Sequence, residues 1–165
     1  VRFKYAGLGV PMVAMLMGML MVLASFFAQT RTVTWPALTV ALPVSFLVAA
    51  ILHGNDLRDL ASDQSAKIKT TALMIGTPAA RALFYALHIA AYLVVSAGAA
   101  VRLLPVWCLL PLLALPLSLG AVKTCAEGFR SNDAARIAKL EGMSAGTHFI
   151  FGALLVLGLI LAKWL

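Results

Sequence analysis

The residues best suited to chemistry in this sequence form one short polar run that follows a long apolar segment. Asn55, Asp56, Asp59 and Asp63 fall within nine consecutive positions, and this stretch holds three of the six acidic residues of the chain. On a continued helix, at 100° per residue, the four side chains fall within an arc of about 100°. Carboxylates that are placed four residues apart, as in Asp59 and Asp63, repel each other unless a cation lies between them. The run therefore predicts a cation site.

Magnesium is the cation that these oxygen ligands fit best. Mg²⁺ is commonly held by one or two carboxylates together with waters and substrate phosphates. Three basic side chains that are suited to non-bridging phosphate oxygens follow within the same segment: Arg58, Lys67 and Lys69. We predict four metal ligands: Asp59, Asp63, Asp56 and Asn55. Of these, Asp59 and Asp63 are also predicted to be catalytic. A solvated, charged loop with its own ion pairs is the simpler alternative to this Mg²⁺-diphosphate site.

The segments that must position the polar run are apolar enough to cross a membrane. Hydrophobic residues make up 62% of the 165 residues and charged residues 12%, whereas ordinary globular chains lie near ~45–50% and ~25%. A spanning helix needs about 20 mostly apolar residues. Five segments meet this requirement: 8–28, 36–54, 82–101, 105–122 and 144–162. The predicted fold class is all-α, a polytopic transmembrane bundle with lipid as its main solvent.

Basic residues are distributed so as to predict an orientation in the membrane. The formal charge is +7, but the cations lie between the apolar segments and form no basic stripe with interleaved aromatics, so we expect no nucleic-acid partner. Ten of the 13 Lys and Arg residues, and all six acids, fall on one side; only Arg31, Arg102 and Lys163 fall on the other. Because cytoplasmic loops are enriched in Lys and Arg, the aspartate-rich segment 55–81 is expected to face the cytoplasm from the inner or cell membrane.

The polar run also resembles a known motif. The pattern Asn55-Asp56-x-Arg58-Asp59-x-x-x-Asp63, with Thr70 seven residues further on, is similar to the second aspartate-rich motif of the UbiA prenyltransferase superfamily. It is most similar to N-N-x-R-D-x-x-x-D-x-x-x-G-K-x-T of the 1,4-dihydroxy-2-naphthoate prenyltransferases of menaquinone synthesis. Residues 4–9, K-Y-A-G-L-G, resemble the K-Y-x-G-L-G that opens the preceding helix in that group. Lys67 and Ile68 stand where the naphthoate group has Gly and Lys, which leaves the acceptor open.

This resemblance implies an architecture and an activity. Family members have nine transmembrane helices in two related halves, each with one aspartate-rich motif, so five spans with the motif after the second match helices five to nine. It implies that residues 1–165 are a C-terminal half, that an N-terminal half is missing, and that the isolated chain is incomplete and inactive. The implied reaction is Mg²⁺-dependent transfer of a prenyl group from a polyprenyl diphosphate to an aromatic, naphthoate- or benzoate-like acceptor.

Three histidines lie in or beside the predicted spans. His53, at the end of the second span, and His88, within the third, are expected to pack inside the bundle, where polar groups in membrane helices usually point. His148, one turn into the last span, is the candidate for a contact with the acceptor.

Three other functions are alternatives to this one. A CDP-alcohol phosphotransferase carries D-G-x-x-A-R, but here Asp63 is followed by Gln-Ser-Ala-Lys. A transporter or channel subunit is expected to place ionisable residues near the middle of the bilayer and to break its helices, whereas the acids here lie at the membrane boundary. A UbiA-like enzyme with a different acceptor remains open. Mg²⁺-dependent release of diphosphate distinguishes an enzyme from a transporter.

Overall fold

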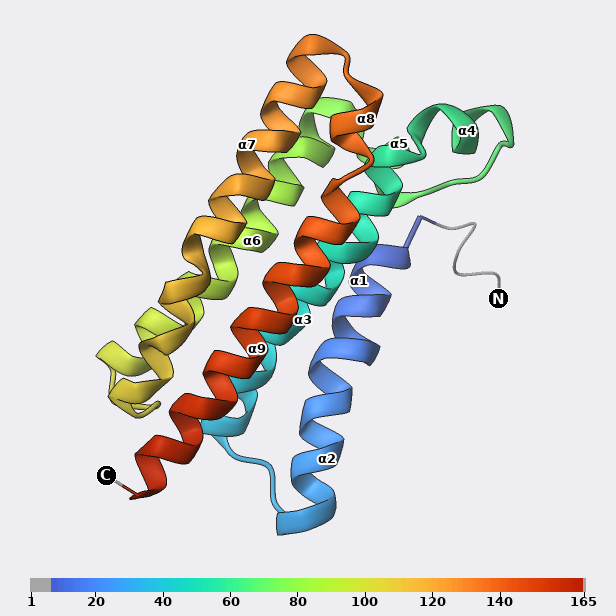
Figure 1. Cartoon of the computed structure of the whole chain (residues 1–165). Helices are drawn as coiled ribbons and strands as arrows, with labels where there is room; N and C mark the ends of the chain where they lie inside the picture. Colours follow the sequence, from blue (N-terminus) through green and yellow to red (C-terminus); the bar gives the residue numbers. More distant parts are fainter. Residues whose placement is uncertain (1–6, 165) are drawn as a thin grey trace.

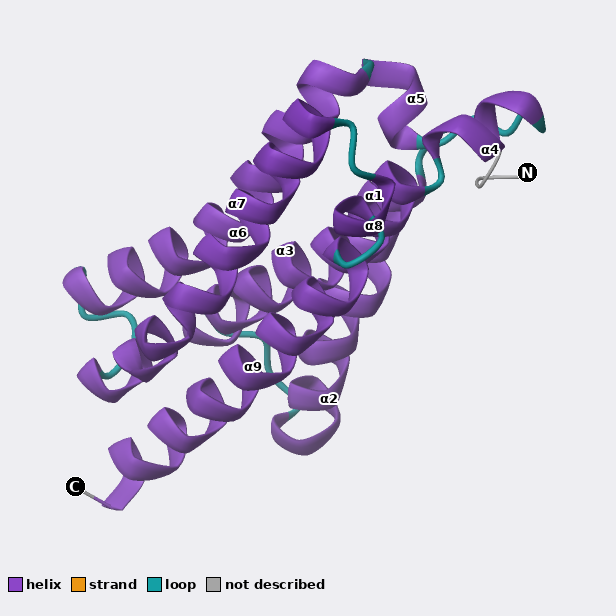
Figure 2. Cartoon of the chain, turned by 45° about the horizontal axis from the view of Figure 1, so that its top comes forward, coloured by secondary structure: helices purple, strands orange, loops and turns teal. Residues whose placement is uncertain are grey.

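The computed structural model describes residues 7–164, and every regular element within that range is helical (Figures 1 and 2). Arg2, Lys4 and Tyr5, which belong to the predicted basic side and opening motif, lie outside the described residues. The elements, in chain order, are α1 (Gly9–Val13), the π-helix η2 (Ala14–Leu20), α2 (Met21–Thr30), α3 (Trp35–Arg58), α4 (Leu60–Ser65), α5 (Thr71–Ile75), α6 (Thr77–Ala100), the 3₁₀-helix η3 (Val106–Ala114), α7 (Leu115–Ser131), α8 (Ala134–Ile137) and α9 (Leu140–Trp164).

Five helical segments in the described part of the chain are long and apolar enough to span a membrane, which confirms the predicted fold class. They are Gly9–Thr30, Trp35–Arg58, Thr77–Ala100, Val106–Ser131 and Ala134–Trp164. Several of these helices are longer than the apolar spans predicted from the sequence. A helix needs continuous backbone hydrogen bonds rather than apolar side chains, so α6 already begins at Thr77, with proline in its first turn.

Two helix crossings are close because glycine leaves room for a neighbouring backbone. A Cβ atom added to Gly18 would lie 2.3 Å from Cα of Ser45 in α3. One added to Gly158 of α9 would lie 2.3 Å from the carbonyl oxygen of Trp107 in η3. Small residues at such contacts let membrane helices pack backbone against backbone.

Buried polar side chains join the helices inside the bundle. The two ring nitrogens of His88 in α6 lie 3.0 Å from Ser118 Oγ in α7 and 3.1 Å from Ser144 Oγ in α9. Tyr92 Oη lies 3.0 Å from the same Ser118 hydroxyl. His53 Nε2 lies 2.7 Å from the carbonyl oxygen of Ala80. Both His53 and His88 are fully buried, which confirms their predicted packing role.

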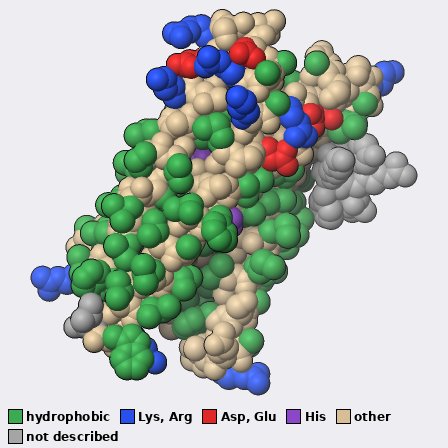
Figure 3. Space-filling view, viewed as in Figure 1, with side chains coloured by type: hydrophobic (Ala, Val, Ile, Leu, Met, Phe, Trp, Pro, Cys, Tyr) green, Lys and Arg blue, Asp and Glu red, His purple; other side chains and the backbone are tan. Residues whose placement is uncertain are grey.

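One end of the bundle is polar. The short helices α4, α5 and α8 lie at the same end, where α3 and α7 finish and α6 and α9 begin (Figure 1). On the face drawn in Figure 3, acidic side chains gather only at this end, and hydrophobic side chains cover much of the surface beyond it. The membrane boundary is therefore expected at the last turn of α3, where the polar run begins.

Candidate functional site

The polar run crosses the end of α3 and a one-residue break. α3 ends at Arg58 and α4 begins at Leu60, while Asp59 has φ −94° and ψ 10°. The backbone N–H of Asp59 still bonds to the carbonyl of Asn55 at 3.0 Å, and that of Asp63 bonds to Asp59 at 2.8 Å. The predicted continuous helix is therefore interrupted at Asp59, although these residues remain on successive turns.

Ser62 lies one turn beyond the break. Its hydroxyl donates to the backbone carbonyl of Asp59 at 2.9 Å, and the same carbonyl also accepts the backbone N–H of Asp63. α4 leaves the direction of α3 at the polar end (Figure 1).

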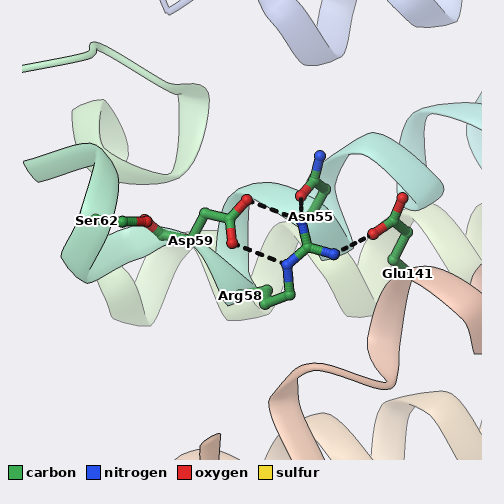
Figure 4. Close-up of polar contacts among 5 residues, drawn as sticks. All are labelled: Asn55, Arg58, Asp59, Ser62 and Glu141. Carbon is green, nitrogen blue, oxygen red and sulfur yellow. Dashed lines mark hydrogen bonds and ion pairs between the residues drawn. The ribbon is translucent and has the colours of Figure 1, made fainter. Parts of the chain in front are cut away.

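The guanidinium group of Arg58 is the centre of the site (Figure 4). Its Nε donates to Asp59 Oδ1 at 2.8 Å, and its Nη2 donates to Asp59 Oδ2 at 2.9 Å. Nη2 also donates to Asn55 Oδ1, and Nη1 donates to Glu141 Oε2 at the start of α9. Arg58 therefore contacts two of the four predicted metal ligands, Asn55 and Asp59.

This contact sets the protonation state of Asp59. Hydrogen bonds from Arg58, and then its positive charge, hold the pKa of the Asp59 carboxyl below its usual range. Asp59 is therefore ionised at neutral pH. The side chains of Arg58 and Asp59 are 37% and 36% exposed, so both remain accessible to a ligand that arrives from the polar end.

Asp56 and Asp63 lie near Asp59 without sharing the guanidinium of Arg58. Asp56 is half-buried beside the backbone N–H groups of Thr71 and Ala72, and it lies within electrostatic range of both other carboxylates. Three neighbouring carboxylates with a single arginine partner form a site of concentrated negative charge, which favours the binding of a cation.

The donor chemistry of this cluster fits Mg²⁺. All four predicted ligands offer oxygen, and Mg²⁺ needs only one or two carboxylates beside waters and phosphates. Across residues 7–164, no three His, Cys, Asp or Glu side chains converge closely enough to hold one ion by themselves. The fit is therefore to a metal that phosphate or water helps to coordinate, and the four-residue ligand set stays a prediction.

The two predicted phosphate-binding lysines lie in the turn between α4 and α5. Lys67 takes the left-handed conformation, with φ 56°, and both Lys67 and Lys69 are exposed. They line a hollow of about 480 Å³ together with Gln64, Ile68, Leu73 and Met74. Neither forms an ion pair within the described chain, and their role in binding diphosphate stays a prediction.

His148 lies on α9, seven residues after Glu141 and so about 10 Å further along the helix axis. It borders a hollow of about 470 Å³ whose other lining residues are Phe149, Gly152, Ala153 and Val156. These neighbours are apolar or lack a side chain, which suits an aromatic or isoprenoid group. The contact with an acceptor stays a prediction.

Glu141 is the site residue that the sequence pattern did not single out. It lies 83 positions from Arg58, in a stretch with no recognisable spacing of acids. The two helices are brought together by Gly54, where an added Cβ would lie 3.0 Å from the backbone nitrogen of Glu141. The only signal in the sequence is an acidic residue near the start of a span, on the same side of the membrane as the polar run.

An all-helical bundle with a carboxylate-rich cluster at its membrane boundary is the architecture that the resemblance led us to expect of a membrane-embedded prenyltransferase. Comparison with known proteins shows that the chain belongs to the UbiA prenyltransferase family, whose sequence model matches residues 1–150.

Relatives from animals and bacteria match almost the whole chain. It is 34% identical over 157 residues to a UbiA prenyltransferase domain-containing protein 1 homolog of Drosophila melanogaster, with 94% of this chain and 41% of the relative covered. It is 32% identical to human UbiA prenyltransferase domain-containing protein 1, and the match covers 98% of this chain and 45% of the human protein. It is 31% identical to the 1,4-dihydroxy-2-naphthoate octaprenyltransferase of Bacillus subtilis, and the match covers 88% of this chain and 46% of the bacterial protein. The chain thus spans less than half the length of these relatives.

Proposed function

We propose that this chain contributes the aspartate-rich site of a membrane prenyltransferase that moves a prenyl group from a polyprenyl diphosphate to an aromatic acceptor. Membership of the UbiA family supports the reaction class. The observation that carries the proposal is the cluster around Arg58, where an amide and two carboxylates surround one guanidinium at the end of a membrane helix.

The proposed ligands of Mg²⁺ are Asp59 and Asp63, assisted by Asp56 and Asn55. When bound, Mg²⁺ neutralises charge that develops on the departing diphosphate. With Mg²⁺ bound to Asp59, Arg58 would be free to donate to the non-bridging phosphate oxygens, a role that suits its planar array of donors. Lys67 and Lys69 reach the same diphosphate from the turn that follows α4.

Glu141 keeps Arg58 in place during this exchange. Asn55 and Asp59 would hold the cation, whereas Glu141 accepts from Nη1 on the other side of the guanidinium (Figure 4). Arg58 would therefore retain Glu141 as a carboxylate partner if a metal took Asn55 and Asp59. We assign Glu141 a positioning role, since it acts through Arg58.

The apolar helices complete the proposed reaction. Loss of diphosphate from the prenyl group breaks a C–O bond and leaves an allylic cation, which water would quench. Lipid-embedded helices exclude water from this step. The electron-rich acceptor ring forms a C–C bond with the cation and then loses the proton of the attacked carbon to the released diphosphate, which restores its aromaticity. His148, beside its apolar hollow, is the proposed contact for that ring.

The acceptor is proposed to be naphthoate- or benzoate-like, as in quinone or menaquinone synthesis. The bacterial relative that is named a 1,4-dihydroxy-2-naphthoate octaprenyltransferase supports the naphthoate choice. Lys67 and Ile68 differ from the motif of that group, which keeps a benzoate-like ring within the proposal.

We further propose that the aspartate-rich segment faces the cytoplasm from the inner or cell membrane, and that transfer requires a second, N-terminal half with its own aspartate-rich motif. The bias of basic residues toward the polar end supports the orientation. The share of each relative that the chain covers, 41–46%, supports the second half. Alone, the chain is expected to insert in membranes without catalysing transfer.

The test is a transfer assay in membranes that contain the protein together with any natural partner half. Labelled polyprenyl diphosphate is supplied with naphthoic or phenolic acceptors, with Mg²⁺ or with a chelator. Prenylated product and free diphosphate are expected in equal amounts and only with Mg²⁺. Uptake of the labelled compound without release of diphosphate would instead support a transporter.

A further inference from the structure

A second polar site lies at the same end of the bundle and shares no residue with the cluster around Arg58. It is a hollow of about 500 Å³ where α6 begins and α7 approaches its end. Its lining residues are Arg81, Lys123, Ala126, Glu127 and Arg130.

The charge of this hollow is positive. Three of its lining side chains are cations, and its single carboxylate, Glu127, is already engaged. Arg136 donates to Glu127 Oε2 from outside the hollow, and Lys123 Nζ lies 3.9 Å from Glu127 Oε1. Neither Arg81 nor Arg130 forms an ion pair among the described residues. The hollow therefore attracts an anion.

Packing holds Arg81 in place at this hollow. Its guanidinium carbon lies 5.4 Å from the centre of the Phe129 ring, a cation–π contact. Its Nε atom is buried, and no acceptor in the described structure meets it with regular hydrogen-bond geometry. Since buried donors are nearly always paired, Arg81 keeps hydrogen-bonding capacity beside the hollow.

Apolar, exposed side chains follow each row of polar ones into the membrane. On α6, Ile89 lies two turns beyond Arg81, and Leu93 lies one turn further on. Each four-residue step rotates about 40° around the helix, so Ile89 is about 80° and Leu93 about 120° from Arg81. On α7, Leu119 lies one turn from Lys123. All three apolar side chains are exposed. A ligand with an anionic head and long apolar chains matches a cationic hollow whose two helices carry exposed apolar side chains further into the membrane.

We propose that Arg81, Lys123 and Arg130 bind the phosphate headgroup of an anionic phospholipid, whose acyl chains lie along α6 and α7. Basic pockets between membrane helices at the cytoplasmic side are suited to such headgroups. The general bias of basic residues requires only cations near the boundary. This site adds an arginine stacked on the Phe129 ring, an Nε donor without a regular partner, and exposed apolar side chains further along the same helices. The site is independent of the prenyl-transfer proposal.

The test measures lipid binding to the protein purified in neutral detergent together with any natural partner half. Native mass spectrometry compares dioleoylphosphatidylglycerol with dioleoylphosphatidylcholine. Each cation near an anionic lipid contributes about 1 kcal/mol. The double variant Arg81→Gln/Arg130→Gln should therefore bind phosphatidylglycerol roughly thirtyfold more weakly. The matched control, Arg31→Gln/Arg102→Gln, loses the same charge at the opposite end and should bind as the wild type does.

Two further measurements keep the test decisive. Lys123 is 77% exposed, so Lys123→Gln leaves the packing intact and should weaken binding roughly fivefold even if the double variant misfolds. Inorganic phosphate added in excess should not displace the lipid, because it has no acyl chains. Equal lipid affinity in the hollow variants and the control overturns the proposal, as does displacement by phosphate or equal binding of phosphatidylcholine.

Discussion

Asp59→Asn separates a catalytic from a structural role for the aspartate-rich run. The substitution keeps the shape of the side chain and removes the charge that Arg58 pairs with at 2.8 Å. Since both side chains are more than one-third exposed, the pair stabilises the fold by only about 0.2–1 kcal/mol. Arg58 also retains Glu141. For a domain of this size we expect the melting temperature to fall by no more than about 4 °C.

The same change should have a far larger effect on prenyl transfer. Loss of an electrostatic stabiliser of a transition state typically lowers turnover by about 10²–10³-fold, so transfer by Asp59→Asn should fall by at least ~10²-fold. Asp63→Asn should behave in the same way. Transfer is measured in membranes at saturating substrate and normalised to the amount of inserted protein.

Asp133→Asn is the matched control for Asp59→Asn. Asp133 is 38% exposed, pairs with Arg136 at 3.1 Å, and accepts the backbone N–H of Arg136 at 3.1 Å to cap α8. Asparagine also caps helices well, so stability should change little and transfer should remain near wild type. Turnover of Asp59→Asn within twofold of wild type, with normal insertion, would refute the assignment of the site.

The pH dependence of the Asp59–Arg58 pair follows from the lowered pKa of Asp59. Because that pKa lies below the unfolded value near 4, the contribution of the pair to stability is fully present above about pH 5. It is lost only as the pH falls through the folded pKa. Asp59 should therefore cause no change in the melting temperature between pH 5 and pH 8.

Three further predictions concern the helices around this site. Gly158→Ala should lower the melting temperature in detergent, because overpacking costs about 1–3 kcal/mol. Gly152→Ala is the control and should not lower it, since an added Cβ there meets no atom within 4 Å. Equal effects of the two substitutions would contradict the close crossing of α9 and η3. Glu141→Gln should weaken binding of Mn²⁺, used as a paramagnetic substitute for Mg²⁺, roughly two- to fivefold in an electron paramagnetic resonance titration. A Glu141 effect that persists after Arg58→Gln would show that it does not act through Arg58. A cysteine at Gln64, introduced after the two native cysteines are replaced, should react with impermeant reagent only from the cytoplasmic side, and labelling only from outside would reverse the predicted topology.

Much of the fold could be predicted from composition because the membrane imposes simple requirements. A backbone that crosses lipid must satisfy its hydrogen bonds internally and present about 20 apolar residues. Both properties are local, so five spans and a polar end were predictable without knowing any contact between helices. The polar run was equally visible, since its residues are neighbours in the sequence.

The tertiary structure alone decided how these parts are combined. Arg58 could be predicted to lie near Asp59, but its partnership with Glu141 depends on the close approach of α3 and α9 at Gly54. The positive hollow at Arg81 likewise depends on the packing of α6 against α7. Composition determines which segments enter the lipid, because transfer from water to hydrocarbon is a property of each segment by itself. Which charged groups meet at their ends is determined by the packing of helices that are distant in the sequence.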